Sequence, residues 1–183
     1  MQHLQSGGAM ESNKFRVVVT ALTVSAAGLL ATLGAEGFRS APYVPTQGDV
    51  PTIGYGSTVY EDGTRVTLAD PAITQERALQ LVRNHKSKDE AMFKASLPGV
   101  LLHQAEYDLY LDFTYQFGIG NWRGSSMRTH LLAGNYPQAC QALLAWRKQD
   151  GRDCSKPQNW GPKGCKGVWT RQQKRFSDCM GVQ

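Results

Sequence analysis

A stretch of 19 residues without a charged side chain, residues 17–35, constrains the fold of this chain more than any other feature of its sequence. As a helix rising about 1.5 Å per residue, it would be roughly as long as the hydrocarbon core of a bilayer is thick. Lys14 and Arg16 precede it, and positive residues at such a place tend to stay in the cytoplasm. We therefore expect that the stretch can insert into a membrane and send everything after it outward.

The same stretch is only weakly hydrophobic for a segment that would stay in a membrane permanently. Thirteen of its residues are Val, Leu or Ala, none is Ile or Phe, and six are Thr, Ser or Gly, which contribute little to insertion. Two alternatives stay open: a cleavable signal peptide, because Leu33-Gly34-Ala35 ends in small residues, and a buried helix of a soluble protein. Residues 1–14 are expected to be an N-terminal tail, either an expression remnant or the product of an alternative start.

Basic residues are concentrated near the C-terminus. The formal net charge is +5, and residues 146–183 alone carry nine Lys and Arg against three Asp and Glu. Such an excess suits anionic partners, but no helix-turn-helix, RRM or zinc-finger spacing accompanies it. We therefore favour a solvated helix face and expect no nucleic-acid partner, although a nucleic-acid binder stays as an alternative. With 41% hydrophobic and 19% charged residues, the composition excludes a disordered chain.

All four cysteines lie in the last 44 residues, and none has the Cys-x-x-Cys and His spacing of a zinc site. We expect no metal or cofactor. An even number of cysteines predicts two disulfides, and hence an oxidising compartment such as the bacterial periplasm. Three pairings are possible. We favour Cys154 with Cys165, which closes a Pro/Gly/Asn-rich loop, and Cys140 with Cys179, which joins two helical stretches; four buried free thiols are the alternative.

The middle of the chain divides into a short β-rich part and a longer helical part. Residues 51–66 alternate apolar side chains around an Asp62-Gly63 turn, which predicts a small β-hairpin. Helical spacing follows, as in Ala78, Leu81, Val82 and His85. The helices are expected near residues 74–97, 101–117, 125–132, 136–148 and 169–179. The sequence therefore predicts an α+β fold with a small antiparallel β-hairpin lobe, a larger helical lobe and a cleft between them.

Residues 36–58 contain Glu-Gly, then Tyr, then Gly, then Thr-Ile-Gly-Tyr-Gly, a pattern that resembles the phage-type lysozymes of glycoside hydrolase family 24. In that family the pattern joins the first helix to the small sheet. The likeness continues through residues 112–118 and 126–136 and covers about residues 36–179 in all. It implies that residues 36–183 form a lysozyme-like catalytic domain. Its expected activity is that of an antimicrobial endolysin, a muramidase that hydrolyses the β-1,4 bond between N-acetylmuramic acid and N-acetylglucosamine in peptidoglycan for host cell lysis.

Hydrolysis of a glycosidic bond needs a protonated carboxylic acid beside the leaving oxygen and a second polar group across the sugar. Glu36 suits the first role, because the end of an apolar helix should partly desolvate its carboxyl group and raise its pKa. The resemblance gives the second role to an Asp and a Thr that hold the attacking water in an inverting mechanism. Pro45 stands at the family's Asp spacing, so we assign Asp49 and Thr52 instead; for Asp49 a turn residue is the alternative.

The resemblance also implies substrate-binding roles in the cleft for Gly56, Gln116 and Arg171, with an arginine near the last position pairing with the catalytic Glu. Tryptophan side chains could stack on sugar rings. The chain has four tryptophans, Trp122, Trp146, Trp160 and Trp169. For Trp146, which lies in a helical apolar pattern, packing in the core is favoured.

The apolar stretch ends directly before Glu36, an arrangement that resembles the signal-anchor-release endolysins. The resemblance implies that a leader, residues 15–35, tethers the enzyme to the host inner membrane through residues 17–35 in an inactive form. The leader then exits the bilayer without being cleaved and refolds as a soluble helix. The released, active form is expected to work in the host periplasm as a monomer. The leader contains no cysteine, so we expect control by topology, with disulfides serving stability. The rival hypothesis is a membrane-tethered wall-binding protein of lysozyme-like fold without turnover.

Overall fold

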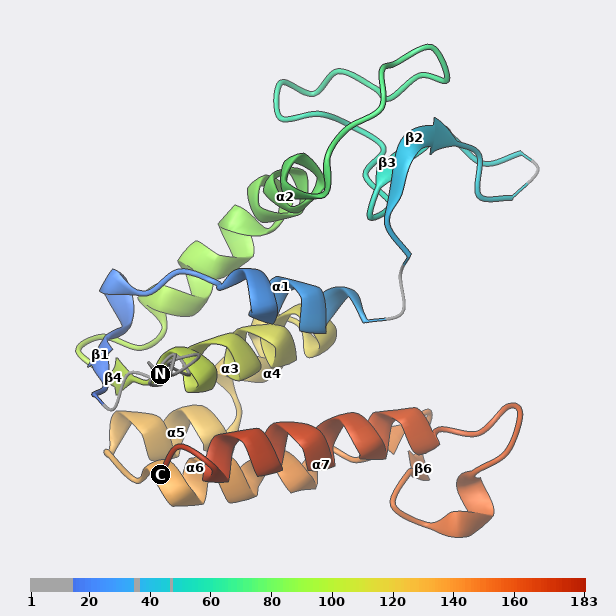
Figure 1. Ribbon diagram of the computed structural model, residues 1–183. Coiled ribbons are helices and arrows are strands. Elements are labelled where there is room, and N and C mark those ends of the chain that lie inside the picture. The colour runs from blue at the N-terminus through green and yellow to red at the C-terminus, as the bar shows by residue number, and fades with distance from the viewer. Residues whose placement is uncertain (1–14, 35–36, 47) are drawn as a thin grey trace, which may run out of the picture.

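A helical lobe and a small β lobe make up the computed structural model, which describes residues 15–34, 37–46 and 48–183 (Figure 1). Seven α-helices lie in these ranges, and together with the short sheets they confirm the predicted α+β class. The helices are α1 (Ala26–Leu33), α2 (Gln75–Ala95), α3 (Gln104–Phe117), α4 (Ile119–Arg123), α5 (Ser126–Leu132), α6 (Tyr136–Ala142) and α7 (Lys166–Met180). In Figure 1, α2 runs from the helical lobe up to the β lobe, so it connects the two.

The strands of the described residues pair as three separate antiparallel ribbons. These are β1 (Val17–Val18) with β4 (Leu101–Leu102), β2 (Arg39–Tyr43) with β3 (Thr52–Gly54), and β5 (Lys148–Gln149) with β6 (Arg152–Asp153). Three short 3₁₀ helices complete the description, at Val19–Ala21, Leu143–Ala145 and Pro157–Asn159. Only the β2–β3 ribbon belongs to the β lobe.

Residue types at the helix ends explain why the expected helices form. The Thr74 hydroxyl accepts a hydrogen bond from the backbone N–H of Arg77 at 3.2 Å and starts α2. The Ser125 hydroxyl does the same for Arg128 at the start of α5. At the start of α3, the Glu106 carboxylate accepts from the backbone N–H of His103 at 2.8 Å. Each cap satisfies a donor that the helix itself leaves unpaired.

The main core surrounds α3. Tyr107, Tyr110 and Phe113 on that helix are fully buried, and so is Trp122 on α4. The Trp122 indole N–H donates to the Ser96 hydroxyl at 2.8 Å, which satisfies its one polar group. A fully buried ring cannot stack on a sugar, so that expectation is wrong for Trp122. Trp146 packs edge-on against Phe113 with the ring centroids 4.9 Å apart, as the favoured core reading predicted.

The apolar N-terminal stretch is not one helix, which corrects the expectation of a soluble helix through its whole length. Its described part forms β1, a 3₁₀ turn and only eight residues of α1. Ser25 is the reason for the late start, because its hydroxyl caps Gly28 N at 2.9 Å while its own backbone N–H donates to Asp108 of α3 at 3.0 Å. Gly28 is needed at this crossing, since a Cβ there would lie 2.6 Å from Cγ of Asp108. None of the helices in the described ranges combines the length and apolarity needed to cross a bilayer.

The β lobe differs in part from the predicted hairpin. Val59 pairs with Arg65 across the expected Asp62-Gly63 turn. The longest ribbon of the lobe, however, joins β2 to β3, and the hairpin prediction did not contain this pairing. Burial of Ile53 against α2 fixes this ribbon. Gly54 has φ +67°, and a Cβ on it would lie 2.7 Å from the Cβ of Ala78, so only glycine fits.

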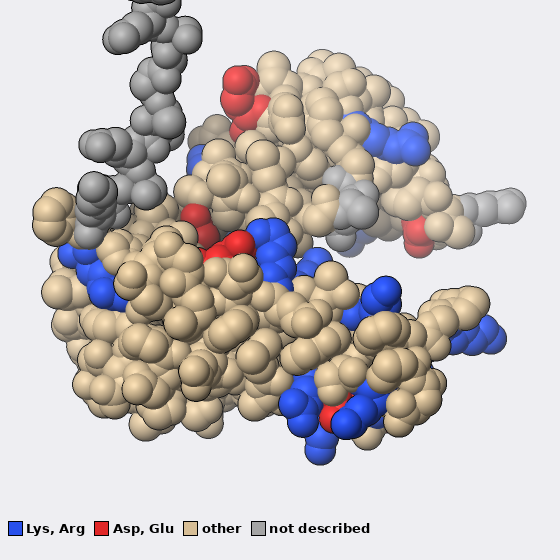
Figure 2. Space-filling view, turned by 60° about the horizontal axis from the view of Figure 1, so that its bottom comes forward, with Lys and Arg blue, Asp and Glu red and all other residues tan. Residues whose placement is uncertain are grey.

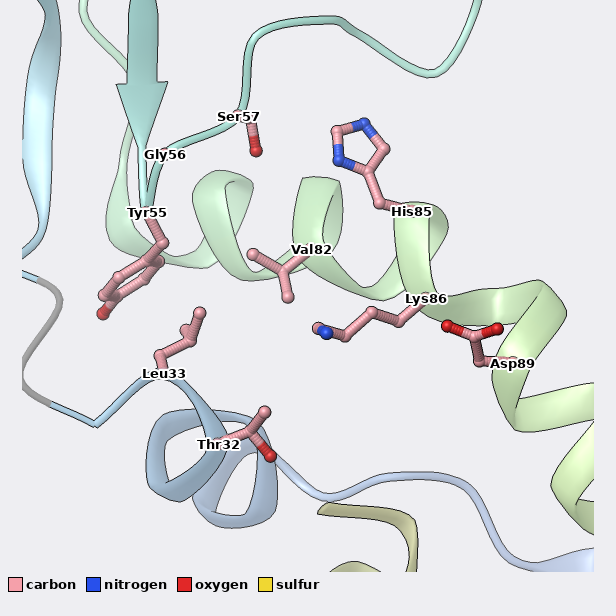
Figure 3. A pocket seen from close by; sticks show the side chains of 9 residues that line it. All are labelled: Thr32, Leu33, Tyr55, Gly56, Ser57, Val82, His85, Lys86 and Asp89. Carbon is pink, nitrogen blue, oxygen red and sulfur yellow. The ribbon is translucent and has the colours of Figure 1, made fainter. Parts of the chain in front are cut away.

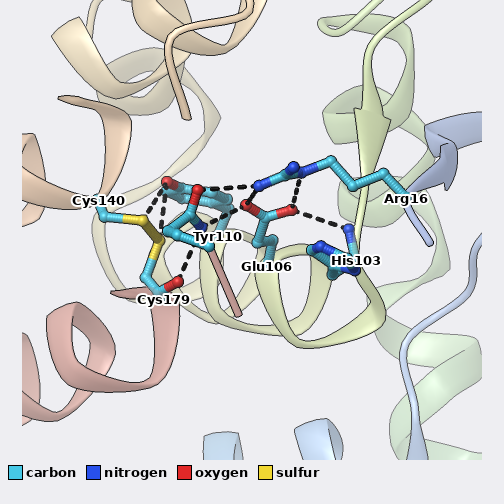
Figure 4. Close-up of a disulfide and its surroundings, with 7 residues drawn as sticks. Arg16, His103, Glu106, Tyr110, Cys140 and Cys179 are labelled. Carbon is cyan, nitrogen blue, oxygen red and sulfur yellow. Dashed lines mark hydrogen bonds and ion pairs between the residues drawn. A yellow bond between two sulfur atoms is a disulfide. The ribbon is translucent and has the colours of Figure 1, made fainter. Parts of the chain in front are cut away.

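Both predicted disulfides are confirmed. Cys140 of α6 is bonded to Cys179 of α7, and Cys154 to Cys165 across the loop that precedes α7. The first disulfide lies beside the Tyr110 hydroxyl, 3.3 Å from the Cys179 sulfur, in the buried interface of α3, α6 and α7 (Figure 4). Such cross-links stabilise the fold mainly by restricting the unfolded chain.

Candidate active site

A cavity of about 360 Å³ lies where the end of α1, the turn after β3 and the middle of α2 meet (Figure 3). Each of the three elements contributes side chains to its wall. The lining residues are Thr32, Leu33, Tyr55, Gly56, Ser57, Val82, His85, Lys86 and Asp89. The wall is thus apolar near α1 and charged toward the far part of α2, which suits a polar ligand with one less polar face.

Glu36, the predicted proton donor, lies outside the described residues, so its prediction stays untested. Its described neighbours are informative. Leu33 ends α1 on the cavity wall, and Gly34 stops the helix with φ +59°. A Cβ on Gly34 would lie 3.5 Å from Nη2 of Arg171, so the guanidinium of Arg171 lies beside the segment that leads to Glu36. Arg171 is not among the residues that line this cavity, and its substrate-binding role stays a prediction.

Thr52 and Asp49 do not line this cavity. Thr52 is the first residue of β3, is only 6% exposed, and its hydroxyl donates to the Tyr43 carbonyl oxygen at 3.3 Å. Asp49 is exposed in the loop before β3, where its backbone N–H donates to the Thr46 carbonyl oxygen at 2.9 Å. No hydrogen bond joins the Asp49 carboxylate to the described residues. The backbone bond fits the turn alternative, and the catalytic role of the Asp49 carboxylate stays a prediction.

The two remaining predicted cleft residues are placed differently. Gly56 lies on the cavity wall, in the turn after β3, with φ +92°. Gln116 is exposed near the end of α3 and is not among the lining residues. The structure therefore brings Gly56 to the cavity and Arg171 to the chain segment at its edge, and it leaves Gln116 outside.

Sequence reasoning missed the polar side chains that α2 contributes. The sequence pattern indicates only a helical spacing for His85, and the structure shows it exposed and lining the cavity with Lys86 and Asp89. A weak signal existed, because these residues follow Val82 on one helical face at i+3, i+4 and i+7. Tyr55 belongs to the quoted motif but received no role; its hydroxyl accepts from Nε2 of Gln75 at 2.7 Å, which fixes the ring.

An ion pair holds α7 against α3 behind α1. Nε of Arg175 donates to Oδ2 of Asp112 at 2.9 Å, and a second nitrogen of the guanidinium contacts the same oxygen. Burial lowers the pKa of Arg175, an effect that Asp112 opposes. The pair lines a groove of about 400 Å³ between α1, α3 and α7 that Arg171 also reaches. Among the described residues no cluster of His, Cys, Asp or Glu is arranged to hold a metal ion.

Comparisons with known proteins identify relatives for most of the chain. A family model described as phage lysozyme matches residues 34–159. The endolysin of Salmonella phage P22 is 31% identical over 132 residues, which make up 72% of this chain and 88% of that protein. The endolysin of Bacillus phage B103 is 30% identical over 136 residues, 72% of this chain and 48% of that protein. The chain therefore spans about half the length of this second relative.

A solved structure of a phage lysozyme is also similar to this chain in its fold. The crystal structure of a mutant P22 lysozyme has a TM-score of 0.64 and 26% sequence identity, over 87% of this chain and 99% of that one. The predicted catalytic residues and the predicted cleft residues Gly56 and Gln116 fall inside the segment that the family model matches, whereas Arg171 follows it.

Proposed function

The chain belongs to the phage lysozyme family, and on that premise we propose which of its residues perform the reaction and how its N-terminal segment controls it. It is a glycoside hydrolase, an endolysin muramidase that degrades peptidoglycan. The predicted lysozyme-like fold is confirmed by the same relatives. Because the curated relatives are endolysins, a wall-binding protein without turnover is not favoured.

Glu36 is the proton donor in this proposal. One observation carries the assignment: the motif that begins at Glu36 runs from the end of α1, where Leu33 lines the cavity, to Gly56 on the opposite wall. A sugar chain in the cavity would thus contact Leu33, three residues before Glu36, and Gly56 near the end of the motif. The carboxylic acid donates its proton to the oxygen of the leaving sugar, and positive charge develops on the other sugar ring.

In this proposal Thr52 and Asp49, which belong to the β lobe and do not line the cavity, hold the water that attacks the sugar from the other side of the ring. The Thr52 hydroxyl uses its hydrogen for the Tyr43 carbonyl oxygen, so its lone pairs can accept a hydrogen bond from water. A water held in this way directs its own lone pair outward, toward the sugar carbon. The Asp49 carboxylate is solvent-exposed, and it takes the second proton as the new bond forms.

Asp49→Asn and Thr52→Val test this pair. We expect Asp49→Asn to lower kcat by roughly 10²-fold or more, because an amide cannot accept the proton. Thr52→Val keeps the shape of the side chain and should lower kcat about tenfold, the worth of one hydrogen bond in the transition state. The measurement is the release of reducing ends from purified peptidoglycan, with NMR to identify the anomer formed first.

Thr58→Val, in the same lobe, is the matched control and should leave kcat unchanged. Full activity in both test variants would remove the pair from the mechanism. Loss in Asp49→Asn alone would leave the carboxylate as the only base. A product that keeps the β configuration would rule out direct attack by water.

The leader, residues 15–35, tethers the inactive enzyme to the host inner membrane before release into the host periplasm. The distribution of its side chains in the folded form supports a low cost of exit. Four of its large apolar residues are buried, namely Val19, Leu22, Val24 and Leu29, while Phe15, Val18 and Leu30 stay exposed. Most of its exposed positions are Thr or Ala. Moving the first group from lipid into a protein core changes its environment little, and exposing Thr or Ala to water costs little.

An ion pair that only the released form can make favours exit. Arg16 forms two hydrogen bonds of 3.0 Å with the carboxylate of Glu106, which is fully buried on α3 (Figure 4). The Gln183 side chain closes the group, accepting from Arg16 and donating to Glu106, both at 2.9 Å. While Arg16 stays on the cytoplasmic side of the membrane, the buried Glu106 lacks this counter-charge, which is costly.

Glu106→Gln should therefore retain more protein in the membrane. We expect the ratio of soluble to membrane-bound chain after depolarisation of the host membrane to fall about tenfold, equivalent to roughly 1.4 kcal/mol. Fractionation followed by immunoblotting and mass spectrometry of the full chain measures it. Glu76→Gln, an exposed glutamate at the start of α2, is the control. Wild-type protein that enters the soluble fraction only after losing its leader would contradict the tether and favour a cleaved signal peptide.

A further inference from the structure

Residues 147–166, here called the basic loop, form a rigid projection beyond the N-terminal end of α7 (Figure 1). The disulfide between Cys154 and Cys165 closes it. Inside, β5 and β6 pair across a tight turn at Asp150 and Gly151, which both have positive φ. Nη1 of Arg152 crosses the loop to the Lys163 carbonyl oxygen at 3.1 Å. The loop thus holds its shape without being part of the hydrophobic core.

The charges of the basic loop are only partly balanced. Its two carboxylates are used within the loop, Asp153 with Arg147 at 3.3 Å and Asp150 with Arg152 at 3.6 Å. Hydrogen bonds from Ser155 lower the pKa of Asp153 further, which keeps it anionic. Among the described residues, the four lysines of the loop have no salt-bridge partner, and all four are exposed: Lys148, Lys156, Lys163 and Lys166. Figure 2 shows basic side chains gathered around acidic groups at this end of the larger lobe.

Trp160 adds an aromatic ring to this charged surface. It is 37% exposed, although its indole N–H is fixed by a 2.9 Å hydrogen bond to the Cys154 carbonyl oxygen. Nζ of Lys166 lies 4.7 Å from the ring centroid. A large apolar ring that is oriented by its own loop and left exposed beside an ammonium group is typical of a contact surface for a ligand with both a sugar face and a negative charge.

We propose that the basic loop is a second binding surface for peptidoglycan, outside the cavity. Trp160 stacks on an N-acetylated sugar ring, and the lysines bind carboxylates of the peptide stems. The proposal rests on peptidoglycan as the substrate and not on the catalytic roles assigned above. Peptidoglycan is favoured over other polyanions because it offers sugar rings and carboxylates together, whereas lipid headgroups give the tryptophan no such ring.

The position of the loop agrees with this use. The helix α7 starts at Lys166, within the loop, and Arg171 follows five residues later beside Gly34 at the edge of the cavity. Five residues of helix rise about 7.5 Å, roughly the width of a sugar unit or two. Basic side chains thus continue from the loop to Arg171 beside Gly34, the residue after Leu33 of the cavity wall, so one glycan strand can contact both surfaces.

The test compares binding to purified sacculi with turnover of a short soluble fragment. In the Lys148→Ala, Lys156→Ala, Lys163→Ala triple variant of the full chain, we expect binding to sacculi to weaken about tenfold, from the loss of three exposed charge contacts. Its kcat on a soluble glycan tetrasaccharide without peptides should stay at the wild-type value. Arg83→Ala, Lys88→Ala, Arg123→Ala is the charge-matched control and should bind sacculi as wild type does.

Two further arms separate the contributions. Trp160→Phe keeps an aromatic ring and should bind better than Trp160→Ala. Sacculi whose carboxylates have been amidated should bind wild type and the triple variant equally weakly. The proposal is overturned if the triple variant binds intact sacculi like its control, or if wild type does not distinguish intact from amidated sacculi. Equal loss of binding by the triple variant to duplex DNA and to anionic vesicles would overturn it in favour of a general polyanion contact.

Discussion

Glu36→Gln is expected to leave a folded protein that lyses peptidoglycan roughly 10²–10⁴-fold more slowly than wild type. The amide has nearly the same size as the carboxylic acid, but it has no proton of suitable acidity for the leaving oxygen. A drop in turbidity of purified sacculi measures the rate. Glu76→Gln, an exposed glutamate far along the chain, should lyse them like wild type.

An activated substrate shows whether the loss is chemical. An aryl glycoside of the same sugar has a leaving group that departs without being protonated, so Glu36→Gln should cleave it nearly as fast as wild type does. If the variant loses both activities equally, Glu36 supports the structure and is not the acid. If the variant keeps its activity on sacculi, the proton comes from another group.

Asp112→Asn is the substitution in the fold with the largest expected effect on stability. Arg175 is 3% exposed and Asp112 is its counter-charge, so the variant leaves a buried guanidinium without an anionic partner. Breaking a buried pair from one side costs about 3–5 kcal/mol. For a domain of this size that is roughly 6–20 °C in Tm, which calorimetry measures. Asp178→Asn, which breaks an exposed pair with Lys174, should shift Tm by no more than about 2–4 °C.

A double variant distinguishes the cost of a lone charge from the worth of the pair. Asp112→Leu with Arg175→Met removes both charges and should recover much of the stability that Asp112→Asn loses, because an apolar pair of similar volume often replaces a buried ion pair without loss. A double variant that is less stable than Asp112→Asn would instead show that the pair itself stabilises the contact of α3 with α7.

Local signals were enough to predict most helices and both disulfides. Thr74 and the break at Pro98-Gly99 bracket α2, and the structure ends that helix at Ala95. The cysteine pairing followed from which pairs close a loop or join two helices, a choice that the contact of α6 with α7 satisfies. Helix limits depend on residues within a few turns of each other, which a single sequence displays, whereas the pairing of Cys140 with Cys179, 39 residues apart, was a choice among only three possible pairings.

Contacts between distant segments were not predictable in the same way. The β2–β3 ribbon joins residues on either side of a long loop, and its register depends on Ile53 meeting α2. Nothing local distinguishes Trp122, which is buried, from Trp160, which is exposed. For the site, the motif led to Gly56, but Lys86 and Asp89 look like the solvated face of an amphipathic helix until the end of α1 is placed opposite them.

Thr20, Ala21 and Thr23 face solvent in the folded enzyme and line neither the cavity nor the groove behind α1. Under the proposed tether, a larger hydrocarbon side chain at these positions would lengthen the stay of the chain in the bilayer without touching the cavity. In that proposal the delay before lysis and the rate of wall cleavage depend on separate residues, so single substitutions here would change the timing of lysis and keep the same catalyst.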